Sequence, residues 1–154
     1  MRKKIFFFIL FVALFNFDLS AQTAYEYKII TTVESIVPMG IGRSRIVEHN
    51  VPLDYKQATS TRDESNKFKK NKTKRKSLKI KSFNETKLLN FYSMVGINFQ
   101  NIASNDALIS SKLTQMSQDG WELFTVISGV ESDAGKGDGK GIFIIRYIFR
   151  RPAQ

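Results

Sequence analysis

The sequence predicts an α+β fold, a small antiparallel sheet of three to four strands with one or two helices packed on it. Three features carry this prediction: an alternating stretch at 25–34, a helical periodicity at 106–119, and two strand-like stretches at 121–127 and 142–150. The chain has 154 residues, 42% of them hydrophobic, with 13 Phe. That is enough for one modest domain, which we expect over 22–154.

The N-terminus has the layout of a secretory signal peptide over 1–21. A cationic start, Met1–Lys4, precedes the apolar run Ile5–Phe15 and a polar stretch that ends at Ala21. A retained membrane anchor is the alternative, but the run is about half of the roughly 20 residues that span a bilayer. We therefore expect cleavage after Ala21, no transmembrane anchor afterwards, and an exported protein in the periplasm or outside the cell.

The two stretches at 121–127 and 142–150 are rich in β-branched and aromatic residues, which predicts an antiparallel hairpin. Charge favours pairing Glu122 with Arg150. That register places Phe124 opposite Ile148 and Val126 opposite Arg146. One face then carries the predicted structural core: Trp121, Leu123, Ile127, Phe143, Ile145, Tyr147 and Phe149.

The stretch 25–34 alternates apolar and polar residues, which is typical of a half-buried strand with one face toward solvent. The apolar set is Tyr25, Tyr27, Ile29 and Val33, and the polar set is Glu26, Lys28, Thr32 and Glu34. A turn containing Pro38, Gly40 and Gly42 follows, and 43–48 is expected to be a short return strand. The only histidine, His49, is expected at the surface at the end of that strand.

Two helices are predicted in the middle of the chain. Apolar residues over 88–95 have helical spacing, with Gly96 as a stop. A second helix is expected to begin with N-cap chemistry at 104–106. Ile109, Leu113 and Met116 form its apolar stripe, and Gly120 closes it in a left-handed conformation. This helix should dock on the apolar face of the sheet.

The other face of the predicted sheet is also apolar. It carries Phe124, Val126, Ile142, Ile144 and Ile148. Either the segment 91–102 wraps underneath this face or another chain covers it, since monomers rarely expose such patches. We expect the segment 91–102 to cover it, because that segment is otherwise unplaced.

A basic insertion, expected to be flexible, occupies 55–82. No acid occurs between Lys67 and Lys81, and the formal net charge of the whole chain is +10. One reading is an anion-binding arm; the other is a solvated insertion that serves only solubility. The candidate anion-binding residues are Lys67, Lys69, Lys70, Lys72, Lys74, Arg75, Lys76, Lys79 and Lys81.

No catalytic, cofactor or metal site is predicted. The chain has no cysteine and one histidine, so it lacks a thiol nucleophile and a set of metal ligands. The Gly-rich stretch 132–141 lacks the phosphate-loop spacing and joins two strands, so it is interpreted as a flexible hairpin tip. These features predict a protein that is not an enzyme, and we infer no small-molecule substrate from them.

Three short segments resemble the family of small bacterial proteins called domain of unknown function 4177. These are the opening strand Tyr25–Ile29 and a helix that ends in Gly120–Leu123, followed by a last strand that closes in Tyr147–Pro152. The resemblance implies a small α+β unit and transfers no catalytic residue. The long insertion over 37–102 departs from the family pattern, so the chain resembles an exported variant.

Together these features predict an exported bacterial protein that is a non-catalytic interaction module of the cell envelope. Its partner would be an envelope protein. The alternative is an accessory protein whose Lys-rich segment 67–81 binds an anionic polymer, such as lipopolysaccharide or nucleic acid.

Overall fold

The computed structural model describes residues 24–35, 44–62, 64, 68–69, 73–93, 95–130 and 142–153. The predicted signal peptide, the turn with Pro38 and the Gly-rich stretch 132–141 lie outside the described residues. The elements are β1 (Tyr25–Ser35), β2 (Arg45–His49), η1 (Tyr55–Gln57), β3 (Thr61–Arg62), β4 (Phe68–Lys69), η2 (Arg75–Leu78), β5 (Phe83–Lys87), β6 (Tyr92–Ser93), β7 (Gly96–Ile97), α2 (Phe99–Gln118), β8 (Glu122–Val130) and β9 (Ile142–Pro152).

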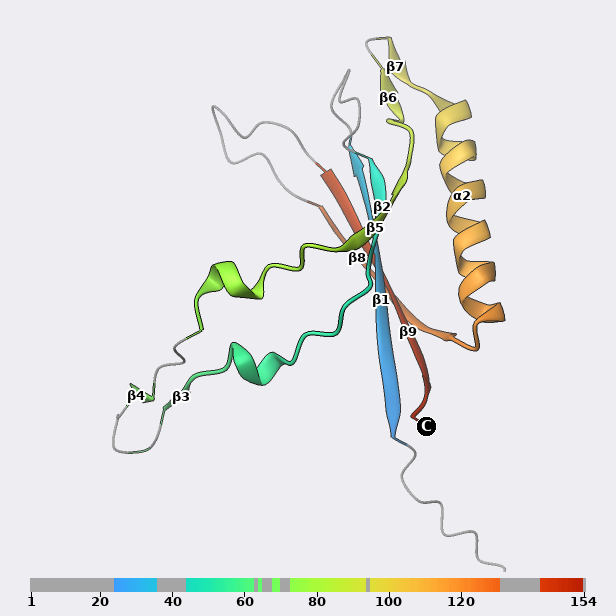
Figure 1. The fold of residues 1–154 in the computed structure, drawn as a ribbon. Helices are drawn as coiled ribbons and strands as arrows, with labels where there is room; N and C mark the ends of the chain where they lie inside the picture. The colour runs from blue at the N-terminus through green and yellow to red at the C-terminus, as the bar shows by residue number, and fades with distance from the viewer. Residues whose placement is uncertain are drawn as a thin grey trace, which may run out of the picture.

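The main sheet is antiparallel and has five strands in the order β5-β2-β1-β9-β8. Helix α2 lies along one side of it, whereas the segment with η1, β3, β4 and η2 extends away from α2 (Figure 1). The predicted α+β class is confirmed, with one strand more than expected. That strand is β5, whose sequence, Phe-Asn-Glu-Thr-Lys, is too polar to stand out as a strand.

The core lies between α2 and the sheet. Phe149, Ile30 and Met116 are each 1% exposed, and Ile46 and Leu88 are buried beside them. Ile109 and Leu113 of the predicted helical stripe pack against this cluster, as do Trp121 and Tyr147. Phe143 and Ile145 are half-buried on the same side of β9.

The register of the hairpin was predicted correctly only at its base. Glu122 faces Arg150, but a β-bulge between Leu123 and Thr125 shifts the rest, so Thr125 faces Ile148 and Ile127 faces Arg146. The predicted pairs of Phe124 with Ile148 and Val126 with Arg146 are therefore wrong. The bulge also moves Ile127 to the face opposite the core, and Leu123 at the sheet margin is 44% exposed.

The two faces of β1 are the reverse of those expected. Ile30 and Thr32 are buried toward α2, whereas Tyr27 is 56% exposed on the other face. The face of β1 that was expected to face solvent is thus the one that α2 covers. Two of its charged residues have partners there: Lys28 forms an ion pair with Glu48, and Glu34 accepts a hydrogen bond from Asn105.

The predicted helix over 88–95 does not form in its described residues: residues 88–93 and 95 contain no helix and include β6, and Gly96, the first residue of β7, has a φ of 116°. Helix α2 begins at Phe99 instead of near 104–106, because Asn98 is the N-cap and its Oδ1 accepts a hydrogen bond from the Asn101 N–H at 3.2 Å.

Asn105, predicted at the helix start, is instead a buried link inside it. Its Nδ2 donates to the carbonyl oxygen of Leu89, and its Oδ1 accepts from the Leu89 N–H, both at 2.7 Å. Nδ2 also lies 3.1 Å from Glu34 Oε2. These bonds hold the extended segment before β6 against α2, and Phe91 contacts Phe143 on the same side. The segment 91–102 therefore does not wrap under the opposite face, contrary to expectation.

The end of α2 follows the prediction. Gly120 has a φ of 79°, and the Trp121 N–H donates to the Met116 carbonyl oxygen at 3.0 Å. This bond closes the last turn and directs the chain into β8.

Candidate functional site

The face of the sheet opposite α2 exposes a group of large apolar side chains, which we call the open face. Its members come from β1 and β8, and their exposed fractions range from 39% to 56%. Alternate residues of β1 supply three of them, and the bulged part of β8 supplies two. The open face consists of Tyr25, Tyr27, Ile29, Phe124 and Ile127.

A guanidinium group sits among the aromatic rings of the open face. Arg150 Cζ lies 4.9 Å from the centre of the Tyr25 ring and 4.7 Å from that of Phe124. Tyr27 meets Phe124 edge-on, with their ring centres 6.1 Å apart. Glu122 holds Arg150 through an Nε–Oε2 contact of 3.0 Å, and this hydrogen bond lowers the pKa of Glu122. The three rings and Arg150 thus form one continuous surface, and the bond from Glu122 fixes the position of the guanidinium group.

A pocket of about 500 Å³ borders the first half of β1. Strand β2 ends at His49 and pairs only with Ile30–Val33, so the residues of β1 before Ile30 have β9 on one side and an opening on the other. The pocket lies in this opening. Its lining comes from β1, the end of β2 and the chain after it, and the end of the β8–β9 pair where β8 begins: Tyr27, Lys28, His49, Asn50, Pro52, Trp121 and Arg151.

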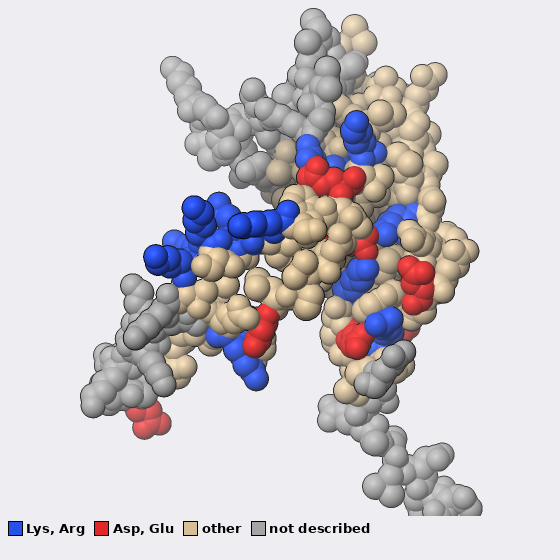
Figure 2. Space-filling view, viewed as in Figure 1, with Lys and Arg blue, Asp and Glu red and all other residues tan. Residues whose placement is uncertain are grey.

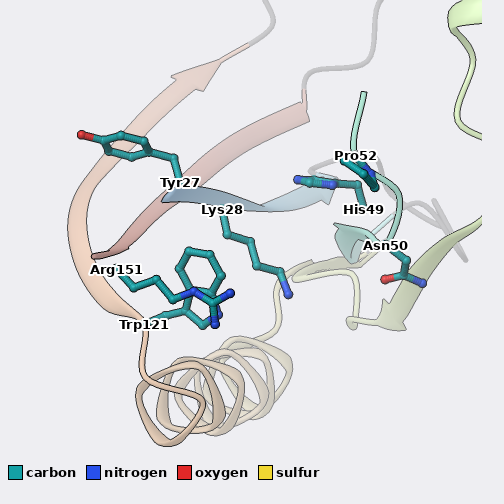
Figure 3. Close-up of a pocket in the computed structure, with 7 residues that line it drawn as sticks. All are labelled: Tyr27, Lys28, His49, Asn50, Pro52, Trp121 and Arg151. Carbon is teal, nitrogen blue, oxygen red and sulfur yellow. The ribbon is translucent and has the colours of Figure 1, made fainter. Parts of the chain in front are cut away.

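Figure 3 shows Arg151 lying over the Trp121 indole, while Tyr27 points away from both. Arg151 Cζ is 4.4 Å from the ring centre, and its Nη2 is 2.8 Å from Glu26 Oε2. Lys28 extends on the side of α2, toward its ion-pair partner Glu48. Both cations of the pocket are therefore already matched by carboxylates.

Glu48 joins the sheet to α2. It is 8% exposed, and it bonds Lys28 on β1 and, at 2.8 Å, Lys112 on α2. Burial acts to raise the pKa of Glu48, but hydrogen bonds and charge from Lys112 and Lys28 together hold it below its usual 4.5. This carboxylate is structural, because its oxygens are both engaged.

The predicted anion-binding residues fall on the segment that leaves the sheet. Lys and Arg side chains gather there in Figure 2, away from the strands. Lys67, Lys70 and Lys72 lie outside the described residues, and Lys69 is described only as part of β4. The remaining five are all exposed around η2, and we call them the η2 cluster: Lys74, Arg75, Lys76, Lys79 and Lys81.

The described residues offer little that would support catalysis. They contain no group of three or more His, Asp or Glu able to hold a metal ion. His49 is exposed at the end of β2, where it was predicted. Burial raises the pKa of Tyr147, and the Glu34 carboxylate acts in the same direction, so the Tyr147 hydroxyl stays protonated at neutral pH.

No described helix is long and apolar enough to cross a membrane.

The sequence predicted an apolar second face, and Phe124, Ile142, Ile144 and Ile148 lie on it as predicted. Val126 was placed there wrongly, since it faces α2, and the predicted apolar set of β1 lies on this face and not on the side of the core. Two signals were available in the sequence. Ile30 shares a face with Lys28 and Thr32, which shows that this face is not uniformly polar. The tyrosines of the other face are amphipathic, so they are well suited to an exposed position.

No known protein family, no curated protein and no solved structure matches the chain.

Proposed function

We propose that this protein is a non-catalytic interaction module that binds another protein through the open face of its sheet. The observation that carries the proposal is the exposure of five large apolar side chains on the face opposite α2. An exposed apolar patch of this kind marks an interaction site more often than a solvent-facing surface.

The composition of the open face fits a protein partner. Tyr25, Tyr27 and Phe124 provide aromatic contact area, and tyrosine and arginine are enriched in protein interfaces. Arg150 is held between two of these rings, so little conformational entropy is lost when it is buried. Arg146 is a second exposed cation on this face of β9. The partner surface should therefore be apolar and carry at least one carboxylate.

In-cell photo-crosslinking tests this function. p-Benzoylphenylalanine at position 27 places the reactive group in the centre of the open face, and the same residue at Ser111 places it on the exposed side of α2. We expect discrete adducts with another protein from position 27 and none from position 111. Equal adduct patterns from both positions would contradict the proposal.

A second substitution separates binding from folding. Ile29→Asp puts an unpaired charge on the open face at a residue that is 39% exposed, so the fold should tolerate it. The adducts from position 27 should decrease at least about tenfold, because a charge buried in an interface is costly. Circular dichroism checks that the variant remains folded.

Binding of an anionic polymer is the second candidate function. The η2 cluster places five exposed cations within eight residues, and none of the ion pairs among the described residues involves them. Such a cluster attracts sulfate or phosphate polymers with a steep dependence on salt.

Neutralising the η2 cluster tests the second candidate. Replacement of its five cations by Gln should lower the salt concentration at which the protein elutes from heparin and reduce the salt dependence of binding to lipopolysaccharide. Unchanged elution would leave the cluster as a solvated surface. Cross-linking from position 27 should not change in this variant.

Export to the cell envelope is part of the proposal, as is membership of the family called domain of unknown function 4177. Both rest on the sequence patterns described above. Mass spectrometry of the protein purified from its host tests export: a mature N-terminus at Gln22 is expected, and an intact N-terminus would contradict it.

A further inference from the structure

Strand β8 forms one edge of the sheet, and beyond its bulge between Leu123 and Thr125 it lacks the features that normally protect an edge. In the described part of the chain, no strand pairs with its outer side. Over its nine residues, Glu122–Val130, the only charge is Glu122 at the start, and there is no Pro or Lys. Natural proteins usually protect exposed edges with charge, Pro, a β-bulge or short length, and the residues of β8 after its bulge, Thr125–Val130, have no charge and no Pro.

The side chains of β8 are exposed on both of its faces, which is unusual even for an edge strand. Phe124 and Ile127 lie on the open face, with exposed fractions of 50% and 52%. Leu123, Val126 and Val130 lie on the side of α2, with exposed fractions of 44%, 47% and 62%. The polar anchors of α2 explain this: Lys112 bonds Glu48 of β2, and Asn105 bonds Glu34 of β1, so the helix lies over other strands.

The opposite edge of the sheet is built differently. Strand β5 has five residues, and Glu85 and Lys87 place both signs of charge on it. Glu85 is held by Arg45 at 2.7 Å. Pairing of β8 with β5 of another molecule would set this charged strand against an apolar one and would also propagate without end. Pairing of β8 with β8 closes after two chains.

The hydrogen-bond pattern shows which groups of β8 point outward. The Ala153 N–H donates to the Ala24 carbonyl oxygen, which fixes the alternation along β1 and β9. Successive residues of β9 bond alternately to β1 and to β8, so Arg146 bonds β8 through its backbone. The backbone groups of Ile127 therefore point toward its β9 partner Arg146. The backbone groups of Val126 and Ser128, on either side of it, therefore point outward.

We propose that the outer edge of β8 pairs antiparallel with β8 of a second copy of this chain. The pairing would satisfy the outward backbone groups of Val126 and Ser128 and bury the apolar side chains of β8 on both faces. It joins two five-stranded sheets into one and places the two open faces side by side. This dimer site shares Phe124 and Ile127 with the open face, whereas the surface proposed for the protein partner is centred on Tyr27 of β1.

Sedimentation equilibrium of the purified protein tests the pairing. A dimer is expected. Val126→Lys should raise the dissociation constant of this dimer at least about tenfold, because lysine on an edge strand prevents pairing with another strand. Ile29→Lys, which places the same charge on the open face of β1, should leave the dimer intact. A monomer at all concentrations, or a dimer lost with Ile29→Lys and kept with Val126→Lys, would overturn the proposal.

A backbone test covers the case in which Val126→Lys fails to fold. Ser128→Pro removes an outward N–H that β9 does not use, and Ser128→Ala keeps it. The dimer should be lost in the first variant and kept in the second, and equal association of the two would contradict edge pairing.

A covalent test uses the absence of cysteine from the chain. A single substitution Ile127→Cys should give a disulfide-linked dimer under mild oxidation, whereas Ser111→Cys should not. Failure of Ile127→Cys to cross-link above the level of Ser111→Cys would contradict the pairing.

Discussion

Glu48 shows at the residue scale how a charge stabilises the contact between the sheet and the helix. One carboxylate serves Lys28 on β1 and Lys112 on α2, and it is 8% exposed. Removing one partner from a group of this kind leaves the others uncompensated, and that loss usually exceeds the net value of the ion pair itself. The lysine side chains are only 26% and 20% exposed, so solvent screens them incompletely.

The lowered pKa of Glu48 makes stability depend on pH in a defined direction. A carboxyl whose pKa is lower in the folded state contributes stability above its unfolded pKa, here 4.5, and that contribution is lost as pH falls through the folded value. We expect the melting temperature to decrease below about pH 4.5, and less steeply in Glu48→Gln.

Thermal unfolding from pH 7 to pH 3 checks this prediction. At pH 7, Glu48→Gln should cost roughly 1 to 3 kcal/mol, less than for a fully buried pair. Glu85→Gln, which affects the exposed pair with Arg45, is the control and should change the pH profile little. Identical profiles for Glu48→Gln and the native protein would contradict the assignment.

Gly120 is the residue whose backbone conformation allows the chain to pass from α2 into β8. Its φ of 79° is a conformation that side chains disfavour, and an added Cβ would meet nothing within 4 Å. Gly120→Ala should therefore cost about 1 to 2 kcal/mol through backbone strain alone. Gly129 also has open space but no positive φ, so Gly129→Ala should not destabilise. Urea denaturation of the two variants measures the difference.

At the scale of elements, Asn105 links α2 to the extended segment that precedes β6. Both its amide nitrogen and its oxygen bond the backbone of Leu89, and it is 1% exposed. Asn105→Ala leaves the part-buried N–H and carbonyl oxygen of Leu89 without their side-chain partner, which should cost about 2 to 4 kcal/mol. Ser104→Ala, at an exposed neighbouring position, should be nearly neutral. Equal free energies of unfolding for the two variants would show that the link contributes nothing.

The elements also show how much of the fold the sequence could predict. Strand β9 and the end of α2 were predictable because periodicity, Gly120 and Trp121 all indicate the same structure. The bulge in β8 was not, since pairing by charge at Glu122 fixes one position and says nothing about an extra residue beyond it. The apolar stretch after Lys87 has helical spacing, but its backbone is bound by Ser44 and Asn105 in an extended form, so tertiary contacts override the local pattern.

The candidate site was only partly predictable for the same reason. The sequence indicates two apolar faces, but which side α2 covers depends on long-range partners. Lys28 and Glu34 look like surface residues until Glu48 and Asn105 are placed beside them. The exposure of Tyr27, at 56%, was not expected, because alternation gives the period of a strand and not its orientation.

At the scale of the whole molecule, the two faces of the sheet have different roles, and paired substitutions distinguish them. Phe149→Ala opens a cavity under α2 and should cost about 3 to 5 kcal/mol. Phe124→Ala, on the open face at 50% exposure, should cost less than about 1 kcal/mol. Chemical denaturation of both variants gives the comparison, and a larger loss from Phe124→Ala would place the stabilising core on the wrong face.

We propose that the open face is exposed in the isolated protein and covered by a partner in the cell. Because the chain has no cysteine, Tyr27→Cys and Ser111→Cys each introduce a single thiol whose rate of labelling by a membrane-permeable maleimide reports exposure. In the purified protein both thiols should react readily. In intact cells, labelling at position 27 should slow at least about tenfold while labelling at position 111 does not. Equal rates at position 27 in purified protein and in cells would contradict the claim.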